Sequence, residues 1–350
     1  MISFILTNDP DFNDEARAEL QQAIPAAILQ EELEPGVWAV ASPVDFFTLA
    51  EQWRQRPPIF VRHICPVWLT CETVETPALS AAEVAVSFPT LTQTAVAEFH
   101  DLIDPSQPFS IQTRIFGDVP YKPFDVNTTL SDAIKTATGA PLDVRRPEQI
   151  LSVVITPLQT YLGLSLTMHN LSDWAGGVRR FAREKGQISR AEFKLLEALE
   201  MFHINLPPRG TALDLGAAPG GWTRVLRQKE QYVTAVDPAW LHNSLQNDKN
   251  VRHLRLTAEE YLAQFPDTYD VIVNDMRLDA RDSARLMGEY GRYLYPHGLA
   301  IITLKLPEKN YQSALDHGLN ILRQNYTIAG ARQLFHNRSE VTVYLRSKSG

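Results

Sequence analysis

The chain has 350 residues, of which 44% are hydrophobic and 21% charged, a composition typical of a folded protein with two or three domains. No apolar run approaches the roughly 20 residues needed to span a bilayer, and the N-terminal segment shows no cleavable signal pattern. We therefore expect a cytoplasmic protein with no membrane partner. The two cysteines, Cys65 and Cys71, are too few for a disulfide framework or a zinc site, so we expect reduced thiols and no metal.

The net charge of −8 is unevenly distributed. Residues 1–60 contain ten acidic residues and three arginines, a net charge of −7, which leaves the rest of the chain almost neutral. Basic residues gather between positions 179 and 194, at a density that favours docking of a polyanion such as RNA. A solvated basic helix face is the alternative interpretation. The RNA-binding candidates are Arg179, Arg180, Arg183, Lys185 and Arg190.

The N-terminal half predicts small α+β units. The first 60 residues indicate strands at 3–6 and 37–41, a helix after Asp11 and a helix over 46–53. Residues 61–108 are irregular and rich in proline and threonine, and they predict no element. The next predicted elements are a strand at 109–115, a helix over 127–136, and strands at 151–156 and 161–167 joined by a connection of hairpin length.

From Thr211 onward, short apolar strands alternate with helical segments. Nearly all-apolar strands indicate a mostly parallel, doubly wound sheet covered on both faces. Only a loop separates the last two strands, so we expect an antiparallel pair at the sheet edge, as is typical of methyltransferase sheets. The predicted strands are 211–215, 232–236, 251–256, 269–274, 299–306, 326–334 and 341–345, and the helices begin near Trp222, Trp240, Ala258, Asp279 and Asn310.

The sharpest functional signal is the turn after the first of these strands, Leu-Asp-Leu-Gly-Ala-Ala-Pro-Gly-Gly-Trp-Thr over residues 213–223. Its glycines let the backbone approach a ligand closely, and the helix that follows offers unpaired amides to a carboxylate. This suits the methionine end of a cofactor. A dinucleotide site needs G-x-G-x-x-G, and the third position from Gly216 is Ala218, so a pyrophosphate is the poorer match.

Polar residues stand at the carboxyl edge of the predicted sheet, where open α/β folds bind ligands. Asp237 and Asp275 end the second and fourth strands; Asp237 is placed to accept the hydroxyls of a ribose, with a helix cap as its alternative role. Lys305 lies in an apolar run, where a lysine is excluded from a core unless it is paired. Glu340 opens the last strand and Lys194 lies in a helix before the first, so we expect all of these residues around one crevice.

These motifs resemble the FtsJ-type ribose 2′-O-methyltransferases. That family has a Lys-Asp-Lys-Glu catalytic tetrad, which the resemblance places on Lys194, Asp275, Lys305 and Glu340. It implies S-adenosylmethionine as the cofactor and a ribose of RNA as the substrate, here a cytidine of large-subunit (23S) rRNA, free or in a precursor particle. The segments that carry the resemblance are residues 189–195, 213–223, 274–276, 304–307 and 331–343.

The resemblance also implies a domain organisation and a set of cofactor contacts. It implies a ferredoxin-like α+β unit over 1–60, a THUMP-like RNA-binding domain over 61–173 and a Rossmann-like methyltransferase domain with a seven-stranded doubly wound sheet over 174–350. In one respect the chain departs from the family, which has an acid after the third strand where this sequence has Thr257, with Glu259 and Glu260 just beyond. The implied cofactor contacts are Ser189, Gly216, Ala218, Pro219, Gly220, Gly221, Trp222, Asp237, Thr257 and Asp275.

The chemistry requires a base, because a ribose hydroxyl ionises only far above neutral pH. Our hypothesis is that neutral Lys305 accepts the hydroxyl proton while Asp275 and Glu340 orient the two lysines, and that both carboxylates favour Lys194. One rival is a methyltransferase acting on a base, on a protein or on another RNA; base methylation commonly uses an Asn/Asp-Pro-Pro-Tyr segment, and residues 274–277 here are Asn-Asp-Met-Arg. The other rival is a non-catalytic RNA-binding or ribosome-assembly factor that retains the fold.

Overall fold

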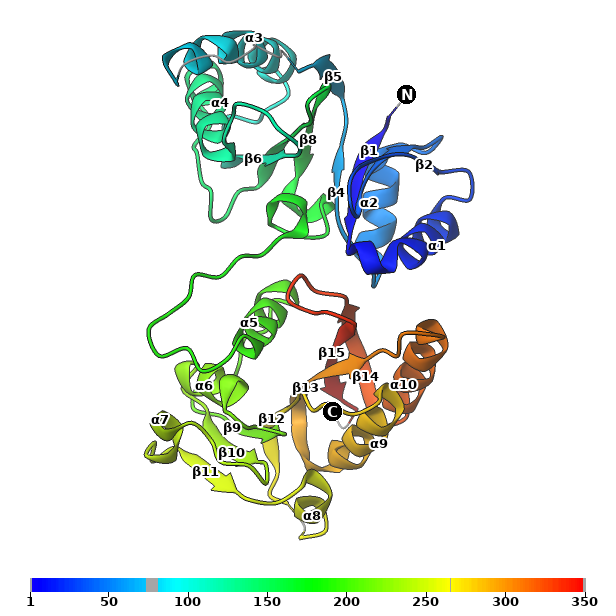
Figure 1. Cartoon of the computed structure of the whole chain (residues 1–350), viewed down its shortest axis with the longest axis vertical. Coiled ribbons are helices and arrows are strands. Elements are labelled where there is room, and N and C mark those ends of the chain that lie inside the picture. The colour runs from blue at the N-terminus through cyan, green and yellow to red at the C-terminus, as the bar shows by residue number, and fades with distance from the viewer. Residues whose placement is uncertain (1, 74–80, 265, 349–350) are drawn as a thin grey trace. The chain divides into compact units, whose positions relative to one another are not determined.

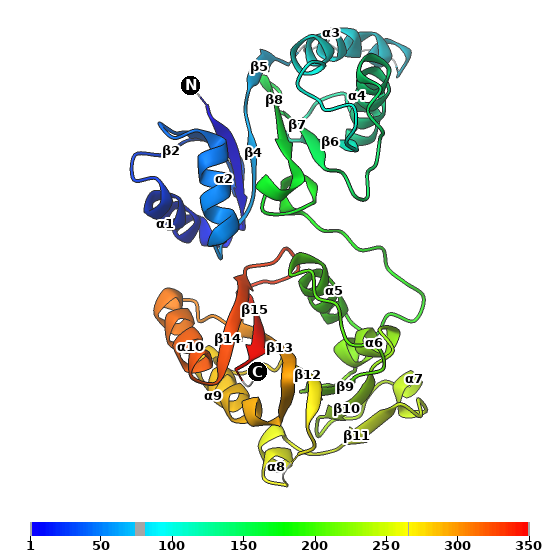
Figure 2. The ribbon, with the colours of Figure 1, turned by 180° about the vertical axis from the view of Figure 1, so that it is seen from behind.

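The computed structural model describes residues 2–73, 81–264 and 266–348. It divides the chain into two compact units, Met1–Val178 and Arg179–Gly350 (Figures 1 and 2). Within the described residues, the first unit contains two four-stranded sheets and the second contains a seven-stranded sheet. The second unit thus begins at Arg179, a few residues after the predicted start at residue 174.

The first sheet is built by the chain order β-α-β-β-α-β, the ferredoxin-like arrangement. Its strands pair antiparallel in the spatial order β2-β3-β1-β4. Leu20, Leu49 and Trp53 from the two helices pack against one face, while Ile5 and Cys65 on the other face pack against the second sheet. The elements are β1 (Phe4–Asn8), α1 (Asn13–Ala23), β2 (Ile28–Glu34), β3 (Val37–Ala41), α2 (Phe46–Gln55) and β4 (Val61–Pro66).

Two strands of this sheet are absent from the sequence prediction, for different reasons. β2 is an edge strand with mostly exposed residues and four acidic or amide side chains, so it lacks the apolar alternation that identifies a strand. β4 is fully buried but lies in the stretch that predicts no element. Because β4 pairs with β1, the first sheet extends beyond the predicted boundary at residue 60.

The second sheet has the order β5-β8-β7-β6, in which β6 and β7 are parallel and the other pairs antiparallel. The predicted hairpin is confirmed as β7 and β8. Val126, Leu130 and Ile134 of α4 pack on this sheet together with Phe99 at the end of α3. The elements are β5 (Leu69–Glu72), α3 (Ala81–Phe99), β6 (Phe109–Ile115), α4 (Pro123–Thr138), β7 (Gln149–Ile155) and β8 (Gln159–Leu166).

The second unit confirms the predicted doubly wound α/β sheet. Its strand order is β11-β10-β9-β12-β13-β15-β14, and β9 to β13 run parallel. α5 and α6 lie on one side of the sheet and α9 and α10 on the other (Figure 1). The strands are β9 (Thr211–Leu215), β10 (Tyr232–Val236), β11 (Val251–Leu254), β12 (Tyr269–Asn274), β13 (Leu294–Lys305), β14 (Tyr326–Arg332) and β15 (Glu340–Ser347). The helices are α5 (Ala191–Met201), α6 (Gly221–Gln228), α7 (Asn243–Gln246), α8 (Ala258–Leu262), α9 (Ala280–Tyr290) and α10 (Tyr311–Asn325).

The terminal strands form the antiparallel pair that the sequence predicts. β15 inserts between β13 and β14 and runs antiparallel to both, so β14 is the edge strand. The register places Lys305, at the end of β13, opposite Glu340, at the start of β15. Two polar residues that are more than thirty positions apart in the chain are thereby brought together at the carboxyl edge of the parallel strands.

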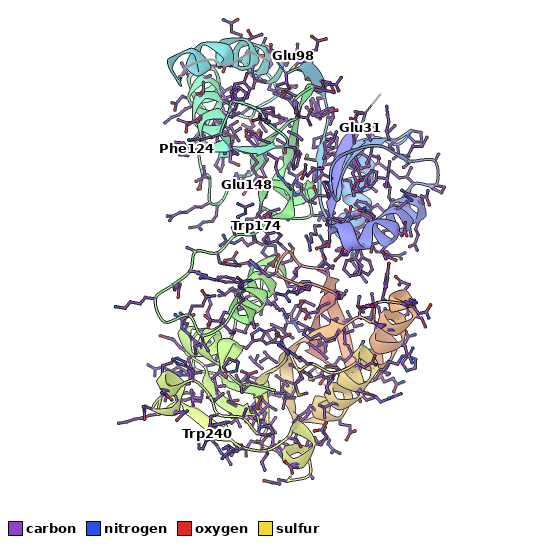
Figure 3. The ribbon with its side chains drawn as sticks, in the orientation of Figure 1. Glu31, Glu98, Phe124, Glu148, Trp174 and Trp240 are labelled. Atoms are coloured by element: carbon purple, nitrogen blue, oxygen red, sulfur yellow. The ribbon has the colours of Figure 1, made fainter. Side chains whose placement is uncertain are left out.

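Two local predictions are wrong. The helix expected near Trp240 begins only at Asn243, after His242, whose ring caps it. Trp240 itself is exposed, and the Arg255 guanidinium lies 4.4 Å from its ring centre (Figure 3). The basic segment 179–190 forms no regular helix, which excludes the alternative of a basic helix face for this stretch.

Several negative findings apply to the part of the chain that the structure describes. There, no helix combines the length and apolar character needed to cross a membrane. The same residues contain no cluster of three or more histidine, cysteine, aspartate or glutamate side chains suited to a metal ion. Cys65 and Cys71 are free thiols, and burial raises the pKa of Cys65 to about 12, so its thiolate is strongly disfavoured.

Candidate active site

A cleft of about 640 Å³ opens at the carboxyl ends of β9, β10 and β12. This is the edge at which doubly wound sheets bind ligands. Almost all of the predicted cofactor residues line it: Ser189, Gly216, Ala218, Pro219, Gly221, Trp222, Asp237, Thr257 and Asp275. Gly220 is not among the lining residues but caps the start of α6. The sequence prediction omits Pro238, Leu256, Glu259 and Met276, which also line the cleft.

The glycine turn has the close packing that its sequence predicts. Gly216 and Gly220 have φ angles of +70° and +112°, in the left-handed region that favours glycine. A Cβ on Gly221 would lie 2.2 Å from Ser189 Oγ, so this position also requires glycine. α6 begins at Gly221 without a side-chain cap, which leaves its first amides to a ligand.

Ser189 and Asp237 add polar groups to the cleft. Ser189 Oγ is buried and has no hydrogen-bond partner among the described residues, which suits a ligand that supplies one. The Asp237 carboxylate accepts hydrogen bonds from the amides of Ala218 at 3.1 Å and Ala239 at 2.8 Å. Since His242 and not Asp237 caps α7, the alternative role of Asp237 as a helix cap is excluded. The residues present therefore fit a nucleoside cofactor with a charged amino-acid end.

Thr257 is committed to the local structure of α8. Its hydroxyl accepts from the Glu260 amide at 3.1 Å, and the Glu260 carboxylate accepts from the Thr257 amide at 2.8 Å, which together form a capping box. The Thr257 side chain and Glu260 thus stabilise the helix start. Glu259, which lines the cleft, is the acid that remains beside the implied adenine position.

The four predicted catalytic residues converge in one ion cluster. Lys305 Nζ lies 2.5 Å from Asp275 Oδ1 and 2.9 Å from Glu340 Oε1. Lys194 Nζ lies 2.6 Å from Glu340 Oε2 and 3.3 Å from Asp275 Oδ1. Their side chains are between 12% and 20% exposed, so the cluster is largely shielded but open on one side. Two positive and two negative charges leave it neutral as a whole.

The expectation that both carboxylates favour Lys194 is wrong. Each carboxylate contacts both lysines, because the antiparallel register of β13 and β15 fixes Glu340 opposite Lys305 while α5 brings Lys194 in from the other side. Burial alone would lower the pKa of Lys194, but the carboxylates of Asp275 and Glu340 outweigh it and raise that pKa. Lys194 is therefore held as a cation, which leaves Lys305 as the candidate base.

Thr303 is a member of the cluster that the sequence prediction omits. Its hydroxyl lies 2.5 Å from Asp275 Oδ1 and 2.7 Å from Lys305 Nζ. Because side chains two residues apart in a strand point to the same face, the position of Thr303 relative to Lys305 is the signal that would have identified it. The threonine hydroxyl gives Lys305 and Asp275 a common partner and restricts where the ammonium group can sit.

α5 organises the surroundings of the cluster through two buried glutamates. Glu192 Oε1 accepts hydrogen bonds from the amides of Ile188 and Ser189, and thereby holds the cofactor-side segment. Glu197, with no exposed surface, accepts from the amides of Phe335 and His336 at 2.8 Å each, and thereby holds the loop that leads to Glu340. Nothing in a helical pattern of glutamates distinguishes such buried carboxylates from surface ones.

The predicted RNA-binding residues fall into two groups. Arg179 is engaged, since Glu200 binds its guanidinium at 2.6 and 3.0 Å. The other candidates have exposed side chains in the irregular segment before α5: Arg180, Arg183, Lys185 and Arg190. Glu184, in the same segment, binds Arg224 at 3.0 Å. The structure therefore keeps most of the basic segment accessible to a polyanion.

Asp214, below the cleft, gives a testable pH dependence. Burial raises the pKa of Asp214 to about 7, although a hydrogen bond from Thr223 opposes the shift. In the unfolded chain this carboxyl ionises near its ordinary pKa of 3.8, so between about pH 4 and pH 7 the folded state binds more protons and loses stability as pH rises. We expect Asp214→Asn to gain stability relative to the wild type across this window and to keep a constant advantage above it.

Denaturant unfolding of both proteins from pH 4.5 to pH 8 measures this difference. Asp316→Asn, at an exposed position, should show no such trend. Parallel curves for wild type and Asp214→Asn would mean that the folded protein does not hold a proton on this carboxyl.

A comparison with protein families identifies the domain that carries this site. Residues 187–288 match the model of the family described as FtsJ-like methyltransferase. The second unit therefore contains an FtsJ-like methyltransferase domain, which confirms the resemblance of the motifs and the Rossmann-like fold.

Among curated proteins, the similar sequences share one name. The ribosomal RNA large subunit methyltransferase M of Halorhodospira halophila is 36% identical over 179 residues, which cover 49% of this chain and 51% of that protein. The protein of the same name from Azotobacter vinelandii is 31% identical over 220 residues, 59% of this chain and 61% of that protein. The chain thus spans about half to three fifths of the length of these relatives.

Among solved structures, TrmN from Thermus thermophilus is similar over 99% of this chain and 100% of that one, with 18% identity and a TM-score of 0.39. Similarity at this level identifies no function.

Proposed function

We propose that the chain is an S-adenosylmethionine-dependent RNA ribose 2′-O-methyltransferase that acts on a cytidine of large-subunit (23S) rRNA. The observation that carries the proposal is the convergence of Lys194, Asp275, Lys305 and Glu340 in one cluster, with Asp275 also lining the cleft. The name of the similar curated proteins supports the rRNA substrate. A cytoplasmic location follows from that substrate.

In this proposal the cleft binds S-adenosylmethionine, which supplies an electrophilic methyl group on a positively charged sulfonium. The first amides of α6 and Ser189 Oγ would hold the amino-acid end, and Asp237 the ribose. Gly216 and Gly221 keep the turn free of side chains that would fill the space. Glu259 would accept a hydrogen bond from the adenine amino group, in place of the acid that the family has at the position of Thr257.

The role of the cluster is to hold and then accept a proton. In the absence of ligands both lysines are paired with carboxylates. Asp275 borders both the cleft and the cluster, so a cation bound in the cleft favours loss of a proton from a lysine. Because the pKa of Lys194 is raised, we assign the proton loss to Lys305, whose Nζ then accepts the proton of the ribose hydroxyl.

The residues 61–173 and the exposed arginines before α5 are the proposed contacts to RNA. A 2′-hydroxyl is reached most easily in a single-stranded or looped region, where the nucleotide can leave the stack. We propose that the sheet of β5 to β8 with its helices serves as a THUMP-like RNA-binding domain.

The direct test is incubation of the protein with labelled S-adenosylmethionine and rRNA from cells that lack it, followed by mapping of 2′-O-methyl positions. A single methylated cytidine ribose would establish the reaction and the target. Label on a base or on protein would favour a methyltransferase of another class. Tight cofactor binding without transfer would favour a non-catalytic RNA-binding factor.

The adenine contact is tested by two adjacent glutamates. Glu259→Ala is expected to weaken cofactor binding by about 3- to 10-fold, the value of one lost hydrogen bond, with little effect on stability. Glu260→Ala removes half of the capping box and should instead lower the free energy of unfolding by about 1 kcal/mol, with cofactor affinity less affected. Calorimetric titration and denaturant unfolding of both variants separate these effects; equal cofactor affinities would exclude Glu259 as the adenine contact.

A further inference from the structure

A group of aromatic rings, here called the aromatic cluster, consists of Phe181, Phe193, Phe335 and His336. Phe181 stacks on Phe193, with ring centroids 5.6 Å apart and planes within 14°. His336 packs against both rings at 5.5 and 5.1 Å, and Phe335 meets His336 edge-on at 5.1 Å. Three separate segments therefore contribute to one aromatic surface.

The aromatic cluster lies next to the ion cluster. Phe193 directly precedes Lys194 on α5, and His336 lies in the loop that leads to Glu340. Figures 1 and 2 both show α5 and the loop between β14 and β15 side by side, and Glu197 joins them by hydrogen bonds to the loop amides. A nucleotide bound on these rings would be a close neighbour of a ribose at Lys305.

Exposure and charge distinguish the aromatic cluster from a core contact. All four rings are only partly buried, whereas core aromatics such as Phe99 and Phe109 are almost fully buried. The Arg179 guanidinium, itself bound to Glu200, lies 4.3 Å from the centre of the Phe181 ring and extends the stack. The same two irregular segments carry exposed arginines: Arg180, Arg183, Arg190 and Arg338.

These arginines matter because the ion cluster itself offers little to a phosphate. Its two lysines are each paired with Asp275 and Glu340, so the attraction for RNA must come from other residues. Stacked aromatic rings flanked by guanidinium groups are the surface that unpaired nucleobases and their phosphates bind.

We propose that the aromatic cluster is the stacking platform for an unpaired base adjacent to the methylated nucleotide, and that the exposed arginines hold the flanking phosphates. This rests on the proposed function, since it assumes that RNA reaches the ion cluster. The partner is single-stranded RNA, and the contact is to the base face, so it tolerates different bases.

The test uses the full chain and a single-stranded oligoribonucleotide that contains 2-aminopurine, whose fluorescence falls on stacking. Phe181→Leu and His336→Ala are compared with Tyr293→Leu, a matched control in which a partly buried ring beside Arg292 is removed elsewhere in the same unit. We expect Phe181→Leu and His336→Ala to bind the RNA about 10-fold more weakly and to lose the quenching, and the control to match the wild type.

A purely structural role would give a different result. If the rings only fix the segment before α5, both variants would lose thermal stability and cofactor affinity in parallel with RNA affinity, and this would overturn the proposal. Unchanged RNA affinity in both variants would overturn it as well. Should Phe181→Leu not fold, His336→Ala decides the matter alone.

Methyl transfer to rRNA, measured separately, distinguishes failure of the platform from failure of the proposed function. Transfer by the wild type with an unchanged KM for RNA in both variants would reject the platform while the methyltransferase stands. Conversely, weaker binding in the variants supports the platform even if no methyl group is transferred.

Discussion

Lys305→Ala is expected to lower the rate of methyl transfer by about 10²- to 10⁴-fold, the range that a positioned general base contributes. Lys305 Nζ lies within 3 Å of Asp275, Thr303 and Glu340, so its position is fixed by three partners. It is not among the residues that line the cofactor cleft, and cofactor affinity should therefore change little. Single-turnover transfer of labelled methyl groups and calorimetric titration of the cofactor measure the two quantities separately.

Lys305→Arg tests whether the residue acts as a base or only as a charge. A guanidinium keeps the positive charge and can still pair with Asp275 and Glu340, but it remains protonated at any accessible pH. We expect the arginine variant to be nearly as slow as the alanine variant. Substantial activity in Lys305→Arg would show that the lysine acts as a fixed charge and that another group accepts the proton.

Glu197→Ala is expected to lower the free energy of unfolding by about 2–4 kcal/mol, because two buried amides lose their acceptor. The Glu197 carboxylate has no exposed surface and binds the amides of Phe335 and His336 at 2.8 Å each. Glu197→Gln retains one acceptor oxygen and should lose less stability, yet it should still slow methyl transfer because the loop that leads to Glu340 is less firmly held. Denaturant unfolding measures the first effect and single-turnover kinetics the second.

Glu200→Ala is the matched control on the same helix. Glu200 is exposed and pairs with Arg179, and such surface pairs contribute at most about 1 kcal/mol. Equal stability of the Glu197 and Glu200 variants would mean that the loop finds other acceptors when Glu197 is removed.

Much of the second unit could be predicted because its strands are short apolar runs between helices. β9, β10 and β12 agree with the predicted bounds at both ends. The site could be predicted because a lysine inside an apolar strand, as at Lys305, requires a partner, and the carboxyl edge of a parallel sheet gathers such residues. The capping box of Thr257 and Glu260 was also readable, since the pattern Thr-x-x-Glu stands in the sequence.

What could not be predicted depends on contacts between distant segments. The contact of both carboxylates with both lysines follows from the register of β13 and β15 together with the position of α5, and neither appears in a local pattern. Likewise, a glutamate in a helix is exposed far more often than buried, so Glu197 carries no local signal of its role. In the first unit, β2 escapes prediction because its polar residues face solvent at a sheet edge.

The position of β15 in the sheet has a consequence for the order in which the site forms. Glu340 follows every other member of the ion cluster in the chain, and its strand fills the gap between β13 and β14. During synthesis, a nascent chain that has not yet reached this strand leaves the facing edges of β13 and β14 unpaired and Lys305 without one of its carboxylates. The active centre is thus completed by a late step of synthesis, and an unfinished chain meets ribosomal RNA without the means to modify it.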